Sequence, residues 1–190
     1  ERLPDGGEVA YYFDRSGLYV ARDDQAGKRI AFVYDGLGRL AEVQDRLGDT
    51  IAYAYDKATG RVSSVTDGRG STTDYTYAAL AGGQYRLTRV DYPDGAYEQY
   101  TYDNRGNVVT WRDAGGGTWN ATSNARGQLL TLQNPTGGTV AFTYRTDGTL
   151  ESMTDSDAGS GTTTFDADSL GRVSRIDYPD GSSEGFSYDA

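Results

Sequence analysis

The sequence predicts an all-β protein of consecutive antiparallel β-hairpins, about 21 residues each, that form a strongly curved, spiralling sheet. The first observation is a stretch, Phe32 to Arg39, that recurs along the whole chain. The second is composition: 16 Tyr and 26 Gly among 190 residues favour strands and tight turns. The third is alternation of apolar residues with period two, without a helical period or helix caps. A sheet of this many strands has to coil or close, because strands twist.

The repeat is marked by an aspartate that follows two aromatic residues separated by one other residue. Its position falls at Asp14, Asp35, Asp56, Ala78, Asp103, Asn124, Arg145, Asp168 and Asp189. The differences between these residue numbers are 21, 21, 22, 25, 21, 21, 23 and 21. A spacing this constant indicates a repeat architecture. We expect residues 1–190 to form a single array of about eight repeats, as an excerpt of a longer repeat protein.

Each repeat reads as a strand, a turn, a second strand and a second turn. Tyr53 and Tyr55 share one face of the first strand, because side chains two residues apart point the same way. An aspartate with glycine three positions later, as in Asp35 and Gly38, suits a type I turn. The motif residues, to which we assign a structural role, are Tyr34, Asp35, Gly38, Arg39, Tyr53, Tyr55, Asp56, Gly60, Arg61, Tyr100, Tyr102, Asp103, Gly106, Tyr144, Gly148, Asp168, Gly171 and Arg172.

The second strand of the repeat carries two apolar residues three positions apart, as in Leu40 and Val43. In a flat strand this spacing would place them on opposite faces, so either both faces are partly covered or a β-bulge resets the register, and we favour the bulge. The sixth repeat lacks the aromatic pair, with Ala121 and Ser123 in its place. We expect the nearby Trp111 and Trp119 to compensate.

Composition excludes several classes of site and partner. The formal charge of −10, from 18 basic and 28 acidic residues, argues against nucleic acid and anionic membranes, which require clustered Lys and Arg. The chain contains no Cys and no His, so it offers no thiolate ligand, no disulfide and no histidine base. No apolar run approaches the ~20 residues of a membrane-spanning helix. We assign no catalytic, cofactor-binding or metal-binding residue.

Two local patterns and one rival fold were weighed against this interpretation. The repeated aspartates fit turn formation better than metal binding, and Asp155-x-Asp157-x-Gly159 lacks the distal Glu of a calcium loop. The tyrosine rows could bind sugar, but alternating aromatics are the ordinary pattern of a packed strand. A β-propeller with two hairpins per blade is the alternative architecture, and it requires a regular difference between alternate repeats that this chain lacks.

The motif Tyr-x-Tyr-Asp-x-x-Gly-Arg-Leu resembles the YD repeats of the Rhs family, which also occur in cocoon-forming subunits of insecticidal toxin complexes and in teneurins. The resemblance covers essentially the whole chain. Departures at the Asp position are Ala78, Asn124 and Arg145, and those at the Arg position are Leu18, Asn107, Gln128 and Thr149. The resemblance implies a strip of hairpins that winds into a hollow shell, in bacteria around a toxic C-terminal segment, and that is secreted or displayed at the cell surface.

The function hypothesis is a non-enzymatic structural module of such a shell, whose main partner is the rest of its own polypeptide. The alternative is a cell-surface module whose curved sheet recognises carbohydrate or protein. A strip with two open edges also predicts dimer formation by edge pairing or strand exchange.

Overall fold

The structure is a computed structural model that describes residues 8–80, 82–157, 159 and 161–189. Every regular element in these residues is a β-strand, so the all-β class is confirmed, and no described helix could span a membrane. The strands are β1 (Ala10–Phe13), β2 (Tyr19–Asp23), β3 (Arg29–Tyr34), β4 (Leu40–Gln44), β5 (Thr50–Tyr55), β6 (Val62–Thr66), β7 (Thr72–Ala79), β8 (Tyr85–Asp91), β9 (Tyr97–Tyr102), β10 (Val108–Arg112), β11 (Thr118–Ser123), β12 (Leu129–Gln133), β13 (Thr139–Tyr144), β14 (Leu150–Asp155), β15 (Gly161–Ala167), β16 (Val173–Asp177) and β17 (Ser183–Gly185).

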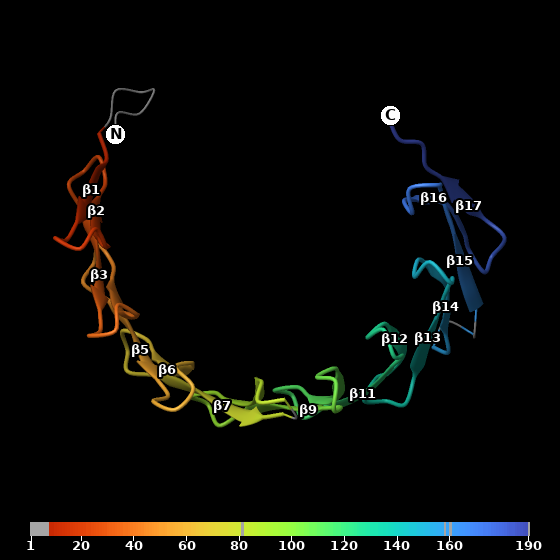
Figure 1. Ribbon diagram of the computed structural model, residues 1–190, viewed down its shortest axis with the longest axis horizontal. Coiled ribbons are helices and arrows are strands. Elements are labelled where there is room, and N and C mark those ends of the chain that lie inside the picture. The colour runs from red at the N-terminus through yellow and green to blue at the C-terminus, as the bar shows by residue number, and fades with distance from the viewer. Residues whose placement is uncertain (1–7, 81, 158, 160, 190) are drawn as a thin grey trace. The chain divides into compact units, whose positions relative to one another are not determined.

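The strands pair with their neighbours in chain order, as consecutive antiparallel hairpins require. The chain divides into two compact units, residues 1–77 with 89–96 and residues 78–88 with 97–190. In the first unit, antiparallel pairing runs from β1 through to β7. In the second unit it runs from β9 through to β17, along a sheet that curves (Figure 1).

Wherever the pairing between the two strands of a repeat is described, a β-bulge interrupts the ladder, which confirms the predicted bulge. In β3–β4, Tyr34 lies opposite Leu40 and Val33 opposite Glu42, so one residue of β4 is left over. Val43 then lies opposite Phe32, and both Leu40 and Val43 face the same side as the aromatic pair. The same shift of register occurs in seven hairpins, three in the first unit's half of the chain and four in the second's.

The two faces of the sheet differ in chemistry. One face, the apolar face, carries the aromatic pairs and the Leu and Val residues of the second strands. The opposite face in the second unit carries cross-strand hydroxyl pairs, whose oxygens lie 2.6 to 2.8 Å apart: Thr101–Thr110, Thr122–Thr131, Thr143–Ser152 and Thr154–Thr162. Among the described residues only Val9, Ala21, Val90 and Thr163 are buried, and the others are half-buried or exposed. Stability therefore has to come from contacts between neighbouring strands.

The tight turns combine a type I turn with a glycine in the left-handed region. In the turn after β3, the N–H of Gly38 donates to the Asp35 carbonyl at 2.9 Å, and the N–H of Asp35 donates to the Arg39 carbonyl at 2.8 Å. Gly38 has φ +75°, as this hairpin loop requires. The closing turn of the same repeat uses the same chemistry, with Asp45 and Gly48. The turn that begins at Asp56 is one residue longer.

Gly38→Ala is expected to lower the free energy of unfolding by about 1 kcal/mol, because an L-residue is strained at positive φ. No atom lies within 4 Å of the added Cβ, so the cost is one of backbone conformation. Gly36→Ala in the same turn is the matched control: Gly36 lacks a positive φ and also faces open space. Its change should stay within about 0.5 kcal/mol in urea unfolding. Equal losses for both variants would contradict this turn geometry.

Candidate functional site

The motif residues assemble where one hairpin meets the next. The hydroxyl of Tyr55 on β5 donates a hydrogen bond of 2.7 Å to the carbonyl of Leu40 on β4. Leu40 is the residue at which the β3–β4 register shifts. Because a bulge disrupts the ladder and a carbonyl away from water needs a donor, the tyrosine satisfies the bulge of the preceding hairpin.

This bond recurs through the chain at a constant spacing. In each case a tyrosine hydroxyl donates to a carbonyl 15 residues earlier. The other pairs are Tyr34 with Tyr19, Tyr102 with Leu87, Tyr144 with Leu129 and Tyr188 with Val173, at distances of 2.6 to 2.9 Å. The second tyrosine of the motif is thus a link between successive hairpins as well as an apolar side chain.

Asp35 and Arg39 complete the arrangement. One carboxylate oxygen of Asp35 accepts the backbone N–H groups of Leu37 and Arg39, at 2.9 and 3.0 Å. Its other oxygen accepts Arg39 Nε at 2.7 Å. The guanidinium carbon of Arg39 lies 4.2 Å from the centre of the Tyr55 ring, within the range of a cation–π contact. The aspartate therefore orders its turn and orients the arginine side chain toward the next hairpin.

We call the four residues Asp35, Arg39, Leu40 and Tyr55, and their equivalents in other repeats, the hairpin clasp. Asp168, Arg172, Val173 and Tyr188 form a second complete clasp, with a 2.7 Å bond between Asp168 and Arg172 Nε and 4.5 Å from Arg172 to the ring. The first tyrosines of the pairs, Tyr53 and Tyr100, fall outside the clasp. The Tyr100 hydroxyl donates to the Glu98 carboxylate. The remaining motif glycines, Gly60, Gly106, Gly148 and Gly171, all have positive φ.

Other copies keep the clasp in altered form. Asn107 stands at an arginine position, and its amide Nδ2 donates to Asp103 at 2.9 Å. In another copy Asn124 replaces the aspartate and Gln128 replaces the arginine, and Asn124 Nδ2 donates to Gln128 Oε1 at 2.8 Å. In the longer turn, Arg61 lies 5.6 Å from the Tyr77 ring centre. Asp56, at the aspartate position of the same copy, accepts the backbone N–H of Thr59.

The seventh repeat replaces the clasp tyrosine with an arginine from the preceding turn. Ala167 occupies the tyrosine position of β15, at the register shift between β15 and β16. The guanidinium of Arg145 donates to the carbonyl of Leu150 at 2.9 Å, the position that tyrosine satisfies elsewhere. It also donates to the Phe165 carbonyl and lies 3.6 Å from Asp166. Arg145 was an unexplained departure in the sequence, and the structure gives it a specific role.

The sixth repeat is held by its tryptophans, as expected. Trp111 and Trp119 lie opposite each other on β10 and β11, with ring centres 5.5 Å apart and planes inclined by 17°. Trp119 Nε1 donates to Asp113 Oδ2 at 3.1 Å. This stacked pair provides aromatic area where Ser123 replaces a tyrosine.

Hydrogen bonds lower the pKa of the clasp carboxylates. For Asp35 the backbone N–H of Arg39 lowers the pKa most, and the Arg39 guanidinium comes next. For Asp168 the guanidinium of Arg172 has the largest effect on the pKa, followed by the Arg172 backbone N–H. The pKa of Asp103 is lowered first by the Asn107 side chain. The folded turns thus favour the charged carboxylate.

Acid is expected to destabilise the fold only below about pH 5. A carboxyl whose pKa is lowered on folding contributes fully above its unfolded pKa of about 3.9. That contribution is lost as the pH falls through the lower folded value. The unfolding free energy measured in urea should be level above about pH 5 and decline steadily below it. A decline that begins near pH 6, roughly where histidine titrates, would contradict this in a chain without histidine.

The patterns considered for metal binding do not form a cluster. The Asp155 carboxylate accepts the N–H of Asp157 at 2.9 Å, and the Asp157 carboxylate accepts the Asn134 amide at 2.7 Å. Among the residues that the structure describes, no three acidic side chains gather around a common point suited to a cation. Asp155 therefore orders its own turn, whereas Asp157 binds a side chain of another turn.

Comparison with known proteins supports the repeat interpretation. No family model matches the chain. The chain is 35% identical over 96 residues to the double-stranded DNA deaminase toxin A of Burkholderia cenocepacia strain H111; the match covers 50% of this chain and 6% of that protein.

Two solved structures have the same fold over most of the chain. The TcdB2-TccC3 crystal structure matches with a TM-score of 0.74 at 15% identity, over 95% of this chain and 11% of that one. A mutant Tc holotoxin pore of Photorhabdus luminescens matches with a TM-score of 0.63 at 16% identity, over 89% of this chain and 12% of that one. The chain thus spans a small part of each. These likenesses confirm the predicted resemblance to the YD-repeat hairpin fold.

Proposed function

We propose, with the YD-repeat hairpin fold as the premise, that residues 1–190 are one array in the wall of a β-hairpin shell that encloses or presents a C-terminal toxin or effector segment. The module is structural and non-enzymatic. Its main partner is the rest of its own polypeptide, and the assembly acts outside the cell that makes it. The observation that carries the proposal is the hairpin clasp, in which the motif residues bind one another and the backbone of the neighbouring hairpin.

A wall of one sheet layer has no second layer against which to pack. Each hairpin must then be held by its neighbours, and stability becomes a sum over neighbouring repeats. The clasp supplies such a contact, complete in two repeats and altered in others. The hydroxyl-lined face of the second unit is suited to a wall that confines a polypeptide, because paired hydroxyl groups give that polypeptide polar rather than apolar side chains to contact.

The match covers only 6% of the relative named as a DNA deaminase toxin, which fits a long polypeptide whose repeats and toxic activity lie in different segments. Zinc deaminases hold the metal with histidine and cysteine. This chain has neither residue, so such a centre cannot be assembled from these 190 residues. We therefore place the toxic activity of the parent polypeptide in a segment outside this array.

Limited proteolysis of the parent polypeptide tests the proposal. The segment that follows the repeats should resist protease in the intact protein. It should become sensitive when Tyr34→Ala and Tyr55→Ala weaken two neighbouring clasps, and stay resistant with Tyr53→Phe, which leaves the clasps intact. Equal cleavage of this segment in all three proteins would contradict enclosure.

The sequence also predicted an alternative role in carbohydrate or protein recognition. Five motif tyrosines use their hydroxyls within the sheet, which favours the structural role over a sugar platform. Dimer formation through open edges stays a prediction that light scattering would test. Robust turnover of glycans, esters, phosphoesters or peptides by the purified chain, abolished by one point mutation, would overturn the non-enzymatic role.

A further inference from the structure

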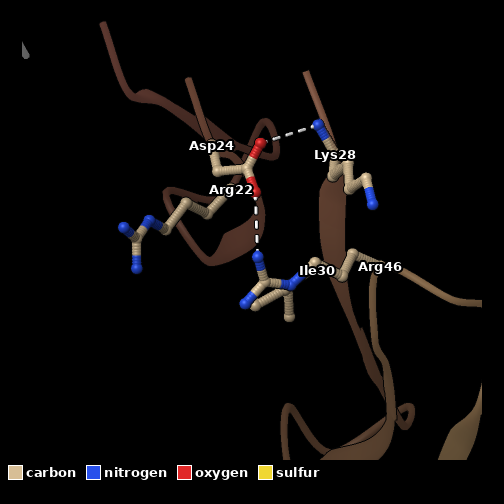
Figure 2. Close-up of a pocket in the computed structure, with 5 residues that line it drawn as sticks. All are labelled: Arg22, Asp24, Lys28, Ile30 and Arg46. Carbon is tan, nitrogen blue, oxygen red and sulfur yellow. Dashed lines mark hydrogen bonds and ion pairs between the residues drawn. The ribbon is translucent and has the colours of Figure 1, made fainter. Parts of the chain in front are cut away.

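A small cavity in the first unit breaks the regular packing of the apolar face. Its volume is about 110 Å³, and Arg22, Asp24, Lys28, Ile30 and Arg46 line it. Figure 2 shows these side chains, with Asp24 between Lys28 and Arg46 and the Arg22 side chain extending away from Asp24. The cavity thus brings three cationic residues and one carboxylate together from β2, from the turn that follows it and from the turn after β4.

Arg22 departs from the repeat at this point. Arg22 stands at the position that Val43 occupies in the next repeat, three residues after the residue equivalent to Leu40. The other repeats carry an apolar side chain there: Val43, Val65, Val90, Trp111, Leu132, Met153 and Ile176. Arg22 pairs with Tyr11 on one side and Ile30 on the other, so it projects from the apolar face. An apolar residue at this position would fill the row, whereas the long arginine leaves a cavity beside it.

The cations of this cluster are not balanced by Asp24. The Asp24 carboxylate already accepts Arg46 Nη1 at 3.1 Å and the backbone N–H groups of Lys28 and Ala26, at 3.0 and 2.9 Å. The Arg22 guanidinium carbon lies 6.0 Å from the Tyr11 ring centre. Within the described part of the chain, neither Arg22 nor the Lys28 ammonium group takes part in a salt bridge. A surplus of positive charge therefore surrounds the cavity in a chain whose formal charge is −10.

We propose that Arg22, Lys28 and Arg46 form a binding site for a small oxyanion, a carboxylate or a phosphate group. Guanidinium groups match both anions in geometry, and the lysine adds a point charge. The cavity is somewhat smaller than the ~150 Å³ cavity that accommodates benzene, which suits a group of this size. Asp24 holds Arg46 in place, and Arg22, which forms no salt bridge within the described residues, supplies a second guanidinium to the anion.

Amide NMR titration of the 190-residue chain tests this site, with sodium phosphate, sodium acetate and a glutamate-containing peptide as probes and sodium chloride at equal ionic strength as the reference. Saturable shifts are expected at the amides of Arg22, Lys28, Ile30 and Arg46. Arg22→Leu should weaken binding at least about tenfold, because it removes a charge-assisted hydrogen bond. Leucine restores the apolar residue of the other repeats, so this variant should fold. If it does not, Lys28→Gln replaces it.

Arg69→Leu is the matched control, since Arg69 is an exposed turn cation in the same unit, outside the cavity. Saturable binding that Arg22→Leu weakens and Arg69→Leu preserves supports the site. Stronger binding of phosphate identifies a phosphoryl ligand, whereas equal binding of acetate and a glutamate-containing peptide identifies a polypeptide carboxylate. Shifts that fail to saturate, or that both variants reduce alike, would overturn the proposal.

Discussion

Tyr55→Ala is expected to lower the unfolding free energy by about 3 kcal/mol, the largest effect of any single motif substitution. The change removes a half-buried aromatic ring together with the hydroxyl that satisfies the Leu40 carbonyl. It also removes the ring that Arg39 covers. Tyr55→Phe isolates the hydroxyl and should cost about 1–2 kcal/mol, because the bulge carbonyl then lacks its donor. Urea unfolding followed by circular dichroism measures both values.

Tyr53→Phe is the control for this prediction. Tyr53 lies on the same strand and face as Tyr55, but its hydroxyl forms no hydrogen bond with the described residues. Its loss should change stability by no more than about 0.5 kcal/mol. If the two Tyr→Phe variants were equally stable, the hydroxyl bond to the bulge would not support the fold.

Arg145→Ala is expected to destabilise the chain by about 2 kcal/mol, the second-largest effect. The substitution leaves the carbonyls of Leu150 and Phe165 without their charged donor. Thermal unfolding should show a lower midpoint than that of Arg126→Ala. Arg126 is an exposed arginine on a neighbouring turn, and its side chain donates a hydrogen bond to the Thr146 carbonyl.

A second substitution sharpens this test. Ala167→Tyr, introduced together with Arg145→Ala, places a tyrosine at the standard clasp position of β15. The double variant should recover at least half of the lost stability, because the new hydroxyl can donate to Leu150 as Tyr144 donates to Leu129. A double variant that is less stable than Arg145→Ala alone would show that Arg145 does not stand in for a tyrosine.

The repeat made most of the fold predictable from the sequence. The 21-residue period predicted the hairpins and their order. The three-residue spacing of Leu40 and Val43 indicated the bulge, since only a register shift puts both residues on the aromatic face. The Asp and Gly spacing gave the turns after the first strands. The closing turns use the same spacing, in Asp24 and Gly27 for example, and sequence reasoning missed that regularity.

The clasp itself could not be read from the sequence. Its acceptor is a backbone carbonyl 15 residues before the tyrosine, and backbone groups leave no trace in residue identity. The contact of Arg39 with Tyr55 depends on how far the side chain reaches across a turn. Arg145 looked like a loss of the motif because its role depends on Ala167, which a two-residue insertion displaces from the usual spacing.

A double-mutant cycle between Arg39 and Tyr55 tests most directly whether the motif joins one hairpin to the next. It compares the unfolding free energies of the chain, Arg39→Leu, Tyr55→Leu and the double variant in urea at low salt. Because the guanidinium covers the ring of the following hairpin, a coupling of about 0.5–1 kcal/mol is expected. Additive effects, with a coupling below about 0.3 kcal/mol, would contradict a clasp between neighbouring repeats.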